Sequence, residues 1–456
     1  MRVWIKRSLL AAFSFGMIGA AQAETLTDAF ILAYQNSNLL EQNRALLRAA
    51  DEDVVIERSA LLPVIKFVSQ SAFQSPARTT AGLKVDNWNT THQLSMSLTL
   101  FDNGQTRYAM DAAKETVLGL RSALLQLEQQ VLLNTVTSYM EVIRAAQAVS
   151  LGQSNVRVIT QELRAARDRF EVGEVTRTDV AIAEARLAAA RGNFASAVGD
   201  LEIARETYMA VVGRAPGNLR WPSAPPMVAK TEHAAKALAE RNHPSIDEAQ
   251  HGVNAAEANI RRSKAGMGPS VTSSAAVNLD DSFESSFQGA LQLNVPIYQG
   301  GRLRALARQA AARRDSARAA LLQSVVNVRR DVGTAWARLQ VAAATTEASR
   351  RQVSASQVAY NGVREEAKLG SRTTLDVLNA EQELLDARTS LITAEVQQYV
   401  SVYTLLSAMG LLTSEHLKLG IVTYDPVEYY NYSSTQAPIS MRGTKLDKVL
   451  KSLGKQ

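Results

Sequence analysis

The chain contains no cysteine in 456 residues, which excludes disulfide bonds, thiolate metal sites, cysteine nucleophiles and the lipid-modified cysteine of bacterial lipoproteins. Histidine is also scarce, with five scattered residues and none in the spacing of a zinc-binding motif. The acidic pairs Glu52–Asp53 and Asp280–Asp281 have the context of solvated surface groups rather than general acids. The sequence therefore predicts no metal, cofactor or catalytic site, and we do not expect an enzyme.

Long apolar runs are absent except for a short one at the beginning of the chain. Residues 1–23 place Arg2, Lys6 and Arg7 ahead of an apolar core, and the small-residue sequence AQA precedes Glu24. This pattern is typical of a signal peptide, so we expect export and a mature chain that starts near Glu24. No later apolar run reaches the ~18 residues of a transmembrane helix, but transmembrane strands give a much weaker signal.

An excess of charge is also absent from the body of the chain, although the net charge is +6. The signal peptide contributes three positive charges, and the tail from Met441 onward contributes four more. The body is therefore close to neutral, which is not the electrostatic pattern of a nucleic-acid-binding protein.

What the chain does contain is an internal duplication. Residues 170–191 and 367–388 agree at nine positions, and Gly370 follows Gly173 by 197 residues. The same offset aligns LFDNGQTR at 100–107 with IYQGGRLR at 297–304, whereas Pro63 and Pro269 are 206 residues apart. One insertion between Pro63 and residue 100 explains the difference. We divide the chain into a first repeat (24–212), a linker (213–231), a second repeat (232–412) and a C-terminal segment with a basic tail (413–456).

Each copy changes its hydrophobic period in the same order. A helical segment, Leu26–Ser59 or Ala234–Lys264, ends before a proline. Two alternating runs follow, at 64–73 and 93–101 in the first copy and at 270–279 and 287–298 in the second. The proline-free stretches Gln105–Arg169 and Arg302–Glu366 then predict helices on the order of 100 Å long.

The alternating runs have two interpretations. Alternation alone favours amphipathic hairpins that pack on a soluble core. The non-apolar face, however, consists of uncharged Ser, Thr, Gln and Asn, which suits the interior of an outer-membrane barrel equally well.

The repeated phrase marks a turn between two helices. Gly173 and Gly370 suit the left-handed conformation that ends a helix. The next helix has candidate capping residues in Thr176 or Thr178, and in Thr373 or Thr374 of the second copy. In both copies an aspartate follows in the first helical turn, where the helix dipole favours it. Taken alone, the phrase predicts a well-capped helical hairpin.

Each copy has the same order of elements: a helix, two strands, a long helix, the VGxxTxTDVxxAEARL turn and a return helix. This order, which occurs twice, resembles that of the TolC family of outer-membrane exit ducts. The resemblance implies a mainly α-helical fold with a β minority, in which three protomers with four strands each form one twelve-stranded barrel. It implies a helical tunnel in the periplasm, with the turns at its closed tip. It also implies a homotrimer in outer-membrane lipid, a periplasmic adaptor and an inner-membrane transporter as partners, no cofactor and no nucleic acid.

The resemblance assigns roles to individual residues. It places on the lipid side Leu94, Met96, Leu98, Leu291, Leu293 and Val295, and it makes Trp88, Phe283 and Phe67 candidates for aromatic girdles. At the tip, Arg372 matches the arginine of the second turn, and Thr178 with Asp179 matches its partner pair on the neighbouring chain. Asp376 matches the first acidic ring. Asn379 stands where the best-known member has the aspartate of a second acidic ring, and Ala367 stands where that member has a tyrosine that helps tie the tip. The links that hold the tip shut and the double acidic ring are therefore only half present.

The function that the resemblance implies is a passive duct for export. The absent lipid-modified cysteine argues against the lipoprotein branch of efflux ducts. The end YDPVEYYNY at 424–432 resembles the C-terminal segment common in ducts assigned to type I protein secretion, which favours that function. Multidrug or small-molecule efflux is the alternative within the family. A periplasmic coiled-coil adaptor or scaffold is the alternative of a different class.

Overall fold

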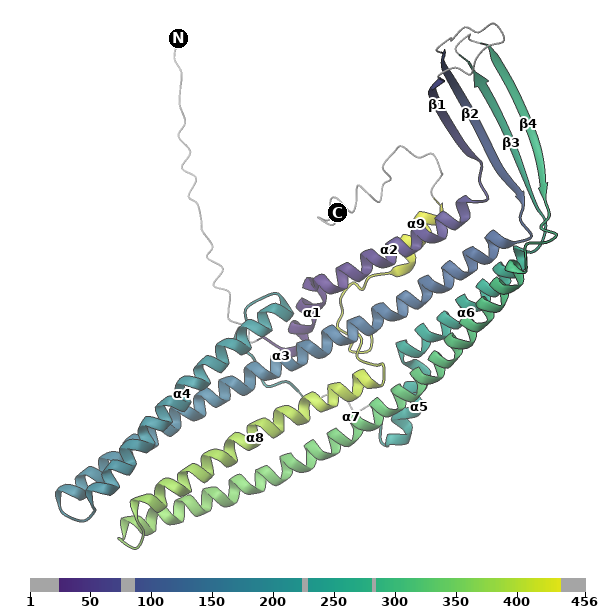
Figure 1. Cartoon of the computed structure of the whole chain (residues 1–456). Coiled ribbons are helices and arrows are strands. Elements are labelled where there is room, and N and C mark those ends of the chain that lie inside the picture. The colour runs from purple at the N-terminus through teal and green to yellow at the C-terminus, as the bar shows by residue number, and fades with distance from the viewer. Residues whose placement is uncertain (1–23, 75–86, 224–228, 281–283, 436–456) are drawn as a thin grey trace, which may run out of the picture. The chain divides into compact units, whose positions relative to one another are not determined.

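The computed structural model describes residues 24–74, 87–223, 229–280 and 284–435 (Figure 1). The predicted signal peptide, the basic tail, Phe283 and the side chain of Trp88 lie outside the described residues. The first series of elements is α1 (Leu26–Asn36), α2 (Asn38–Ser59), β1 (Val64–Gln74), β2 (Asn87–Phe101), α3 (Gln105–Glu171) and α4 (Arg177–Val212). The second series is α5 (Glu232–Asn242), α6 (Pro244–Ala265), β3 (Ser270–Leu279), β4 (Ser285–Asn294), α7 (Arg302–Lys368) and α8 (Thr374–Ala408), followed by α9 (Pro426–Thr435).

The duplication predicted from the sequence is present in the structure. The long helices α3 and α7 each span 67 residues, and α7 begins 197 residues after α3. The strand β3 begins 206 residues after β1, so the two offsets of the sequence alignment recur in the element boundaries. The predicted fold class, mainly α with a β minority, is confirmed.

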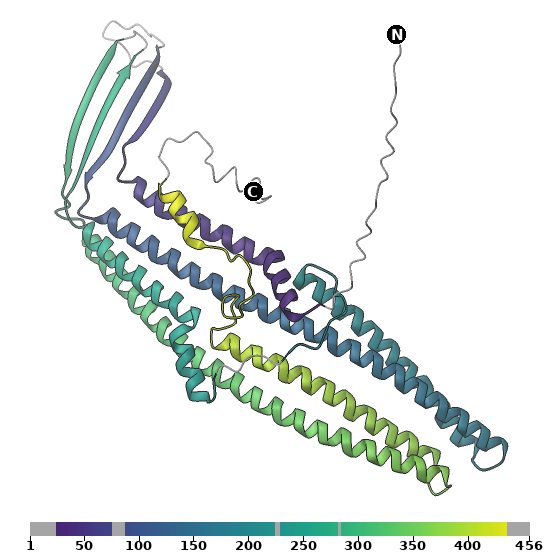
Figure 2. The same ribbon diagram turned by 180° about the vertical axis from the view of Figure 1, so that it is seen from behind.

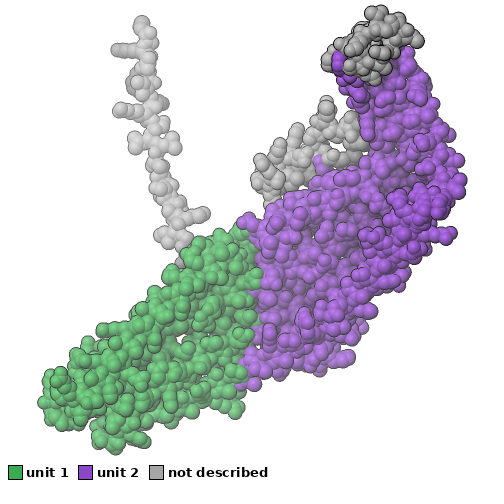
Figure 3. Space-filling model, viewed as in Figure 1, with its two compact units in different colours: residues 1–36, 134–225, 345–400 green, residues 37–133, 226–344, 401–456 purple. Residues whose placement is uncertain are grey.

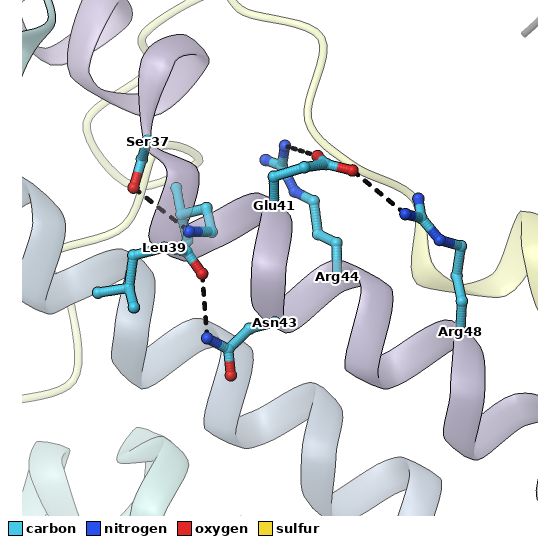
Figure 4. A network of polar contacts seen from close by, with 7 residues as sticks. Ser37, Leu39, Glu41, Asn43, Arg44 and Arg48 are labelled. Carbon is cyan, nitrogen blue, oxygen red and sulfur yellow. Dashed lines mark hydrogen bonds and ion pairs between the residues drawn. The ribbon is translucent and has the colours of Figure 1, made fainter. Parts of the chain in front are cut away.

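The first helical segment of each copy was predicted as one helix and consists of two. In the first copy the break is at Ser37, whose extended backbone lets its hydroxyl accept a hydrogen bond from the Leu40 amide at 3.3 Å (Figure 4). In the second copy the break is at His243, because the residue before a proline avoids the helical region and Pro244 starts α6. The prediction of single helices was wrong because it weighed periodicity and not these caps.

The strands form one antiparallel sheet in the order β1-β2-β3-β4 (Figure 2). A register shift between Thr99 and Phe101 marks a bulge where β2 pairs with β3. The last strand ends at Asn294, so Val295 lies after it and the predicted extension of this strand to residue 298 was wrong. Pro296, which has no amide hydrogen to donate to a ladder, is the second residue after the end.

The chain folds as two compact units, each built from both halves of the duplicated sequence (Figure 3). One comprises residues 1–36, 134–225 and 345–400, and contains the turns that join α3 to α4 and α7 to α8. The other comprises residues 37–133, 226–344 and 401–456, and contains the sheet. Among the described helices, none is both long enough and apolar enough to cross a membrane.

Candidate functional site

The sheet has one apolar face, and the register of its strands assembles this face from all four of them. Residues that pair across neighbouring strands lie on the same face. The pairing places Phe67 beside Leu94, Leu94 beside Val277, and Val277 beside Phe287. The same face carries Ile65, Met96, Leu98, Leu291 and Leu293. Five of the six residues that the resemblance assigns to the lipid side therefore share one face of the sheet. The sixth, Val295, lies beyond the end of β4.

This apolar face is uncovered in the single chain. Phe287 is 76% exposed and Leu291 is 70% exposed. Soluble monomers rarely expose a contiguous apolar surface of this kind, which marks a site for lipid or for another protein. The interpretation of hairpins packed on a soluble core is therefore wrong for this sheet, because no described helix covers its large apolar side chains.

The opposite face of the sheet is mostly polar. The amide of Gln93 donates a hydrogen bond to Asn278 Oδ1 at 2.9 Å across β2 and β3. Further polar residues of this face are Ser95, Ser97, Ser274, Gln288 and Gln292. In the described strands the face carries one charged residue, Lys66. A sheet with one apolar face and one polar face that carries a single charge suits a wall between lipid and water.

The two outer strands are open edges. Within the described chain β1 pairs with β2 alone and β4 pairs with β3 alone. An open edge leaves a row of backbone N–H and C=O groups available to another strand. The sheet is therefore incomplete both at its edges and on its apolar face.

The second part of the candidate site is the pair of turns at 172–176 and 369–373, which we call the tip turns. Gly173 and Gly370 have φ angles of 83° and 80°, as predicted for glycines that end a helix. The first tip turn joins the 67-residue helix α3 to α4, and the second joins the 67-residue helix α7 to α8.

Both return helices start with the same cap. The Asp179 amide donates to Thr176 Oγ1 at 3.3 Å, while the Thr176 amide donates to the Asp179 carboxylate at 2.9 Å. Thr373 and Asp376 repeat this reciprocal pair at 3.2 and 3.0 Å. The sequence left Thr178 and Thr374 as alternative caps, and the structure assigns the role to Thr176 and Thr373. The hydrogen bonds from the threonines lower the pKa of both aspartates.

The cap assignment gives a local prediction. Replacing Thr176 with alanine should destabilise the start of α4 by about 1 kcal/mol, because a backbone amide loses its side-chain partner. Hydrogen exchange of the first amides of α4 measures this loss. Thr178→Ala is the matched control, because Thr178 lies within the helix and not at its cap. Equal effects of the two substitutions would contradict the assignment.

The gate residues named from the resemblance do not all meet within one chain. Arg372 Nε donates to Glu366 Oε2 at 2.8 Å, and no contact joins it to Asp179 among the described residues. Asn379 accepts a hydrogen bond from Arg186 at 3.1 Å, which joins α8 to α4. A bond from Arg372 to Asp179 of a neighbouring copy remains a prediction.

Ala367 is part of the packing near the second tip turn. It is buried with Tyr360, Val377 and Leu384. This position therefore fills a hydrophobic cluster between α7 and α8. An alanine side chain has no hydroxyl with which to tie one helix to another.

Most of the identical positions of the repeated phrase belong to one of two groups in the structure. The first group forms the turns and caps described above. The second group is buried: Leu187 and Leu384 match each other, as do Ala190 and Ala387. Most of the repetition is therefore explained by the construction of two equivalent hairpins.

Sequence reasoning missed several buried carboxylates. Asp51 is fully buried, and Glu381 is buried with a raised pKa caused first by desolvation. A signal for Asp51 was available, because it falls on the buried stripe of α2 formed by Leu47, Ala50 and Val54.

Comparison with known proteins agrees with this geometry. The sequence matches the family described as outer membrane efflux protein over residues 31–214 and 236–411. It is 36% identical to the outer membrane efflux protein BepC of Brucella suis biovar 1 (strain 1330), over 90% of this chain and 91% of BepC. It is 25% identical to the outer membrane protein TolC of Escherichia coli (strain K12), over 88% of this chain and 85% of TolC.

A third relative and one solved structure extend the comparison. The chain is 26% identical to the proteases secretion protein PrtF of Dickeya chrysanthemi, over 82% of this chain and 85% of PrtF. Its fold is similar to that of CusC, with a TM-score of 0.75 and 18% identity, over 84% of this chain and 91% of the CusC chain. The crystal structures of CusC concern folding and transmembrane channel formation. At this identity the likeness to CusC concerns the fold alone.

Proposed function

We propose that three copies of this chain form a passive exit duct that works with a periplasmic adaptor and an inner-membrane transporter. The chain belongs to the outer membrane efflux protein family, and this membership is the basis of the proposal. The family places the chain in the outer membrane and among channel proteins rather than enzymes. Membership also confirms the resemblance to TolC that the repeated phrase indicated. The trimer and the two partners are the parts of this function that we propose.

The observation that carries the proposal is the incomplete sheet. Four strands do not close a barrel that encloses an aqueous bore, because the diameter of a barrel grows with its strand number. Three copies supply twelve strands and join each β4 edge to a β1 edge of the next copy. In that arrangement the apolar face of Phe67, Leu94 and Leu291 faces lipid, and the face of Gln93 and Gln292 lines the bore. This one arrangement thus pairs the open strand edges and covers the exposed apolar face with lipid.

We assign the tip turns to a periplasmic gate. Three copies of Asp376 around one axis would form a ring of carboxylates, and rings of this kind favour cations. In the trimer, Arg372 would give up or share its hydrogen bond to Glu366. It would donate a charge-assisted hydrogen bond to Asp179 of the next copy. Asn379 and Ala367 make this gate less strongly tied than one with two acidic rings and a tyrosine. We further assign to a collar around the tunnel the described parts of the linker and of the C-terminal segment, at 213–223, 229–231 and 413–435.

For the cargo we propose protein secretion of type I as the first candidate. The supporting observations are the segment YDPVEYYNY and the similarity to the proteases secretion protein PrtF. Small-molecule efflux is the second candidate, because the efflux protein BepC is the more similar of these two relatives. Absence of cysteine is compatible with both.

Deletion of the gene separates the two candidates, and extraction of the protein from cell fractions tests the duct itself. For secretion, we expect an exported protein to disappear from the medium while antibiotic susceptibility changes little. For efflux, we expect susceptibility to several antibiotics to rise while secreted proteins are unchanged. An adaptor or scaffold would instead be recovered as a soluble monomer or dimer, and this result would reject the duct.

A further inference from the structure

The short helix α9 packs on α2 in the unit that contains the sheet (Figure 1). Tyr424 and Tyr430 of this C-terminal segment contact the hydrophobic cluster formed by Leu47, Val54 and Val117. Two arginines stack on the same tyrosines: the Arg44 guanidinium lies 5.4 Å from the ring centre of Tyr424, and the Arg121 guanidinium lies 5.9 Å from that of Tyr430. The segment is therefore held by apolar packing and by cation–π contacts.

An unusual carboxylate lies beside this cluster. Asp51 of α2 is 0% exposed, and neither of its carboxylate oxygens accepts a hydrogen bond from the described residues. Its nearest cation is Arg121, with Nη2 at 4.0 Å from Oδ1. Burial of an ionised carboxylate without hydrogen bonds is strongly unfavourable, whereas a protonated one is tolerated much better.

The neighbouring charges are largely engaged elsewhere. Arg44 and Arg48 both bond to Glu41, at 3.4 and 3.2 Å (Figure 4). Arg121 of α3 donates to the Pro426 carbonyl at 3.3 Å, at the first residue of α9. From α9, Tyr429 donates its hydroxyl to Glu52 Oε1 at 2.9 Å. Asp51 therefore faces one cation from α3 at 4.0 Å, a like charge from Glu52, and tyrosines from the C-terminal segment.

We propose that the surface formed by α2 and α3 around Leu47, Val54 and Val117 is a proton-dependent docking site for the chain's own segment 424–435, and that Asp51 is the group that takes up the proton. Docking of the segment removes Asp51 from water, so docking and protonation favour each other. Loss of the proton leaves an ionised carboxylate without hydrogen bonds under α9, and this weakens docking. The periplasmic pH would then control whether the C-terminal segment is attached or free to meet a partner.

The direction of the pH effect follows from burial. Desolvation raises the pKa of Asp51 from 3.8 to about 6, with Arg121 opposing the rise and Glu52 adding to it. A group whose pKa is raised in the docked state stabilises that state fully below its unperturbed pKa, and loses this contribution as the pH rises through about 6. If burial by α9 causes the whole shift, the docked-to-undocked ratio falls by about a hundredfold between pH 4 and pH 8.

The absence of cysteine makes a direct test simple. A spin label on Val427→Cys, an exposed position of α9, reports the mobility of the segment in the purified full-length protein. We expect an immobile spectrum at pH 5 and a mobile component that grows as the pH rises to 8, because the raised pKa of Asp51 in the docked state makes docking weaker at higher pH. Asp51→Asn in this background should remain immobile from pH 5 to pH 8, because an amide cannot ionise. Asp53→Asn, an exposed carboxylate on the same helix, is the matched control and should keep the wild-type response.

Two results would overturn the proposal. One is a label on α9 whose mobility does not change between pH 5 and pH 8. The other is an Asp51→Asn protein whose label keeps the wild-type pH dependence. If the variant does not fold, hydrogen exchange of α9 in the unmodified protein decides instead, and protection that is equal at both pH values after correction for intrinsic exchange rejects the proton-dependent site. None of these results depends on the cargo or on the number of copies in the duct.

Discussion

Replacing Leu291 with arginine should prevent assembly of the protein in the outer membrane. Leu291 lies on the apolar face of β4, and it is 70% exposed in the single chain. If this face contacts lipid, an arginine near the middle of the bilayer costs about 2–4 kcal/mol in each copy. We therefore expect little or no oligomer in outer-membrane fractions, as measured by native electrophoresis after extraction in mild detergent.

The next residue along the strand provides the control. Gln292 pairs with Thr272 and lies on the opposite, polar face. Gln292→Arg introduces the same charge one position away, but toward the proposed aqueous bore. It should assemble normally and alter only the ion preference of the channel. Equal assembly of the two variants, or failure of Gln292→Arg alone, would contradict the assignment of the faces.

Two substitutions at the tip turns should have separable effects on conductance. Arg372→Ser should increase the conductance in planar bilayers and the leak of large antibiotics, because a tie to the neighbouring copy is lost while the acidic ring is kept. Asp376→Asn should leave the closed state largely intact and lower the preference for cations. Hydrogen bonds from Thr373 lower the pKa of Asp376, so the wild-type cation preference should persist when the pH falls from 7 to 5.

A control is needed because Asp376 also caps α8. Thr373→Ala removes the reciprocal cap and keeps the carboxylate charge. It should weaken the start of the helix and leave the selectivity near that of the wild type. If Thr373→Ala and Asp376→Asn change selectivity equally, the cap and not the ring explains the effect. Unchanged leak in Arg372→Ser together with unchanged selectivity in Asp376→Asn would reject the gate.

Much of the fold was predictable from the sequence because local signals and the duplication agreed with each other. The stretch Gln105–Arg169 lies within α3, which extends two residues further, and the alternating runs correspond to the strands. The breaks at Ser37 and His243 were missed, because a single cap or an X-Pro pair interrupts a helix without changing its apolar periodicity.

Less of the candidate site could be predicted. The glycines of the tip turns have a local reason for their conformation, so their role was visible in the sequence. The bond from Arg372 to Glu366 depends on side-chain geometry at the turn, which residue spacing does not specify. The surroundings of Asp51 include Arg121 of α3 and tyrosines of a segment more than 350 residues away, and only the folded chain brings these groups together.

The proposed duct depends on the number of chains that share one sheet. Cryo-electron microscopy of the protein extracted from outer membranes measures this most directly. We predict three copies around one axis, with β4 of each paired to β1 of the next and with Leu94 and Leu291 on the outer surface. A single copy, a pair, or a particle in which the β1 and β4 edges stay unpaired would contradict the account.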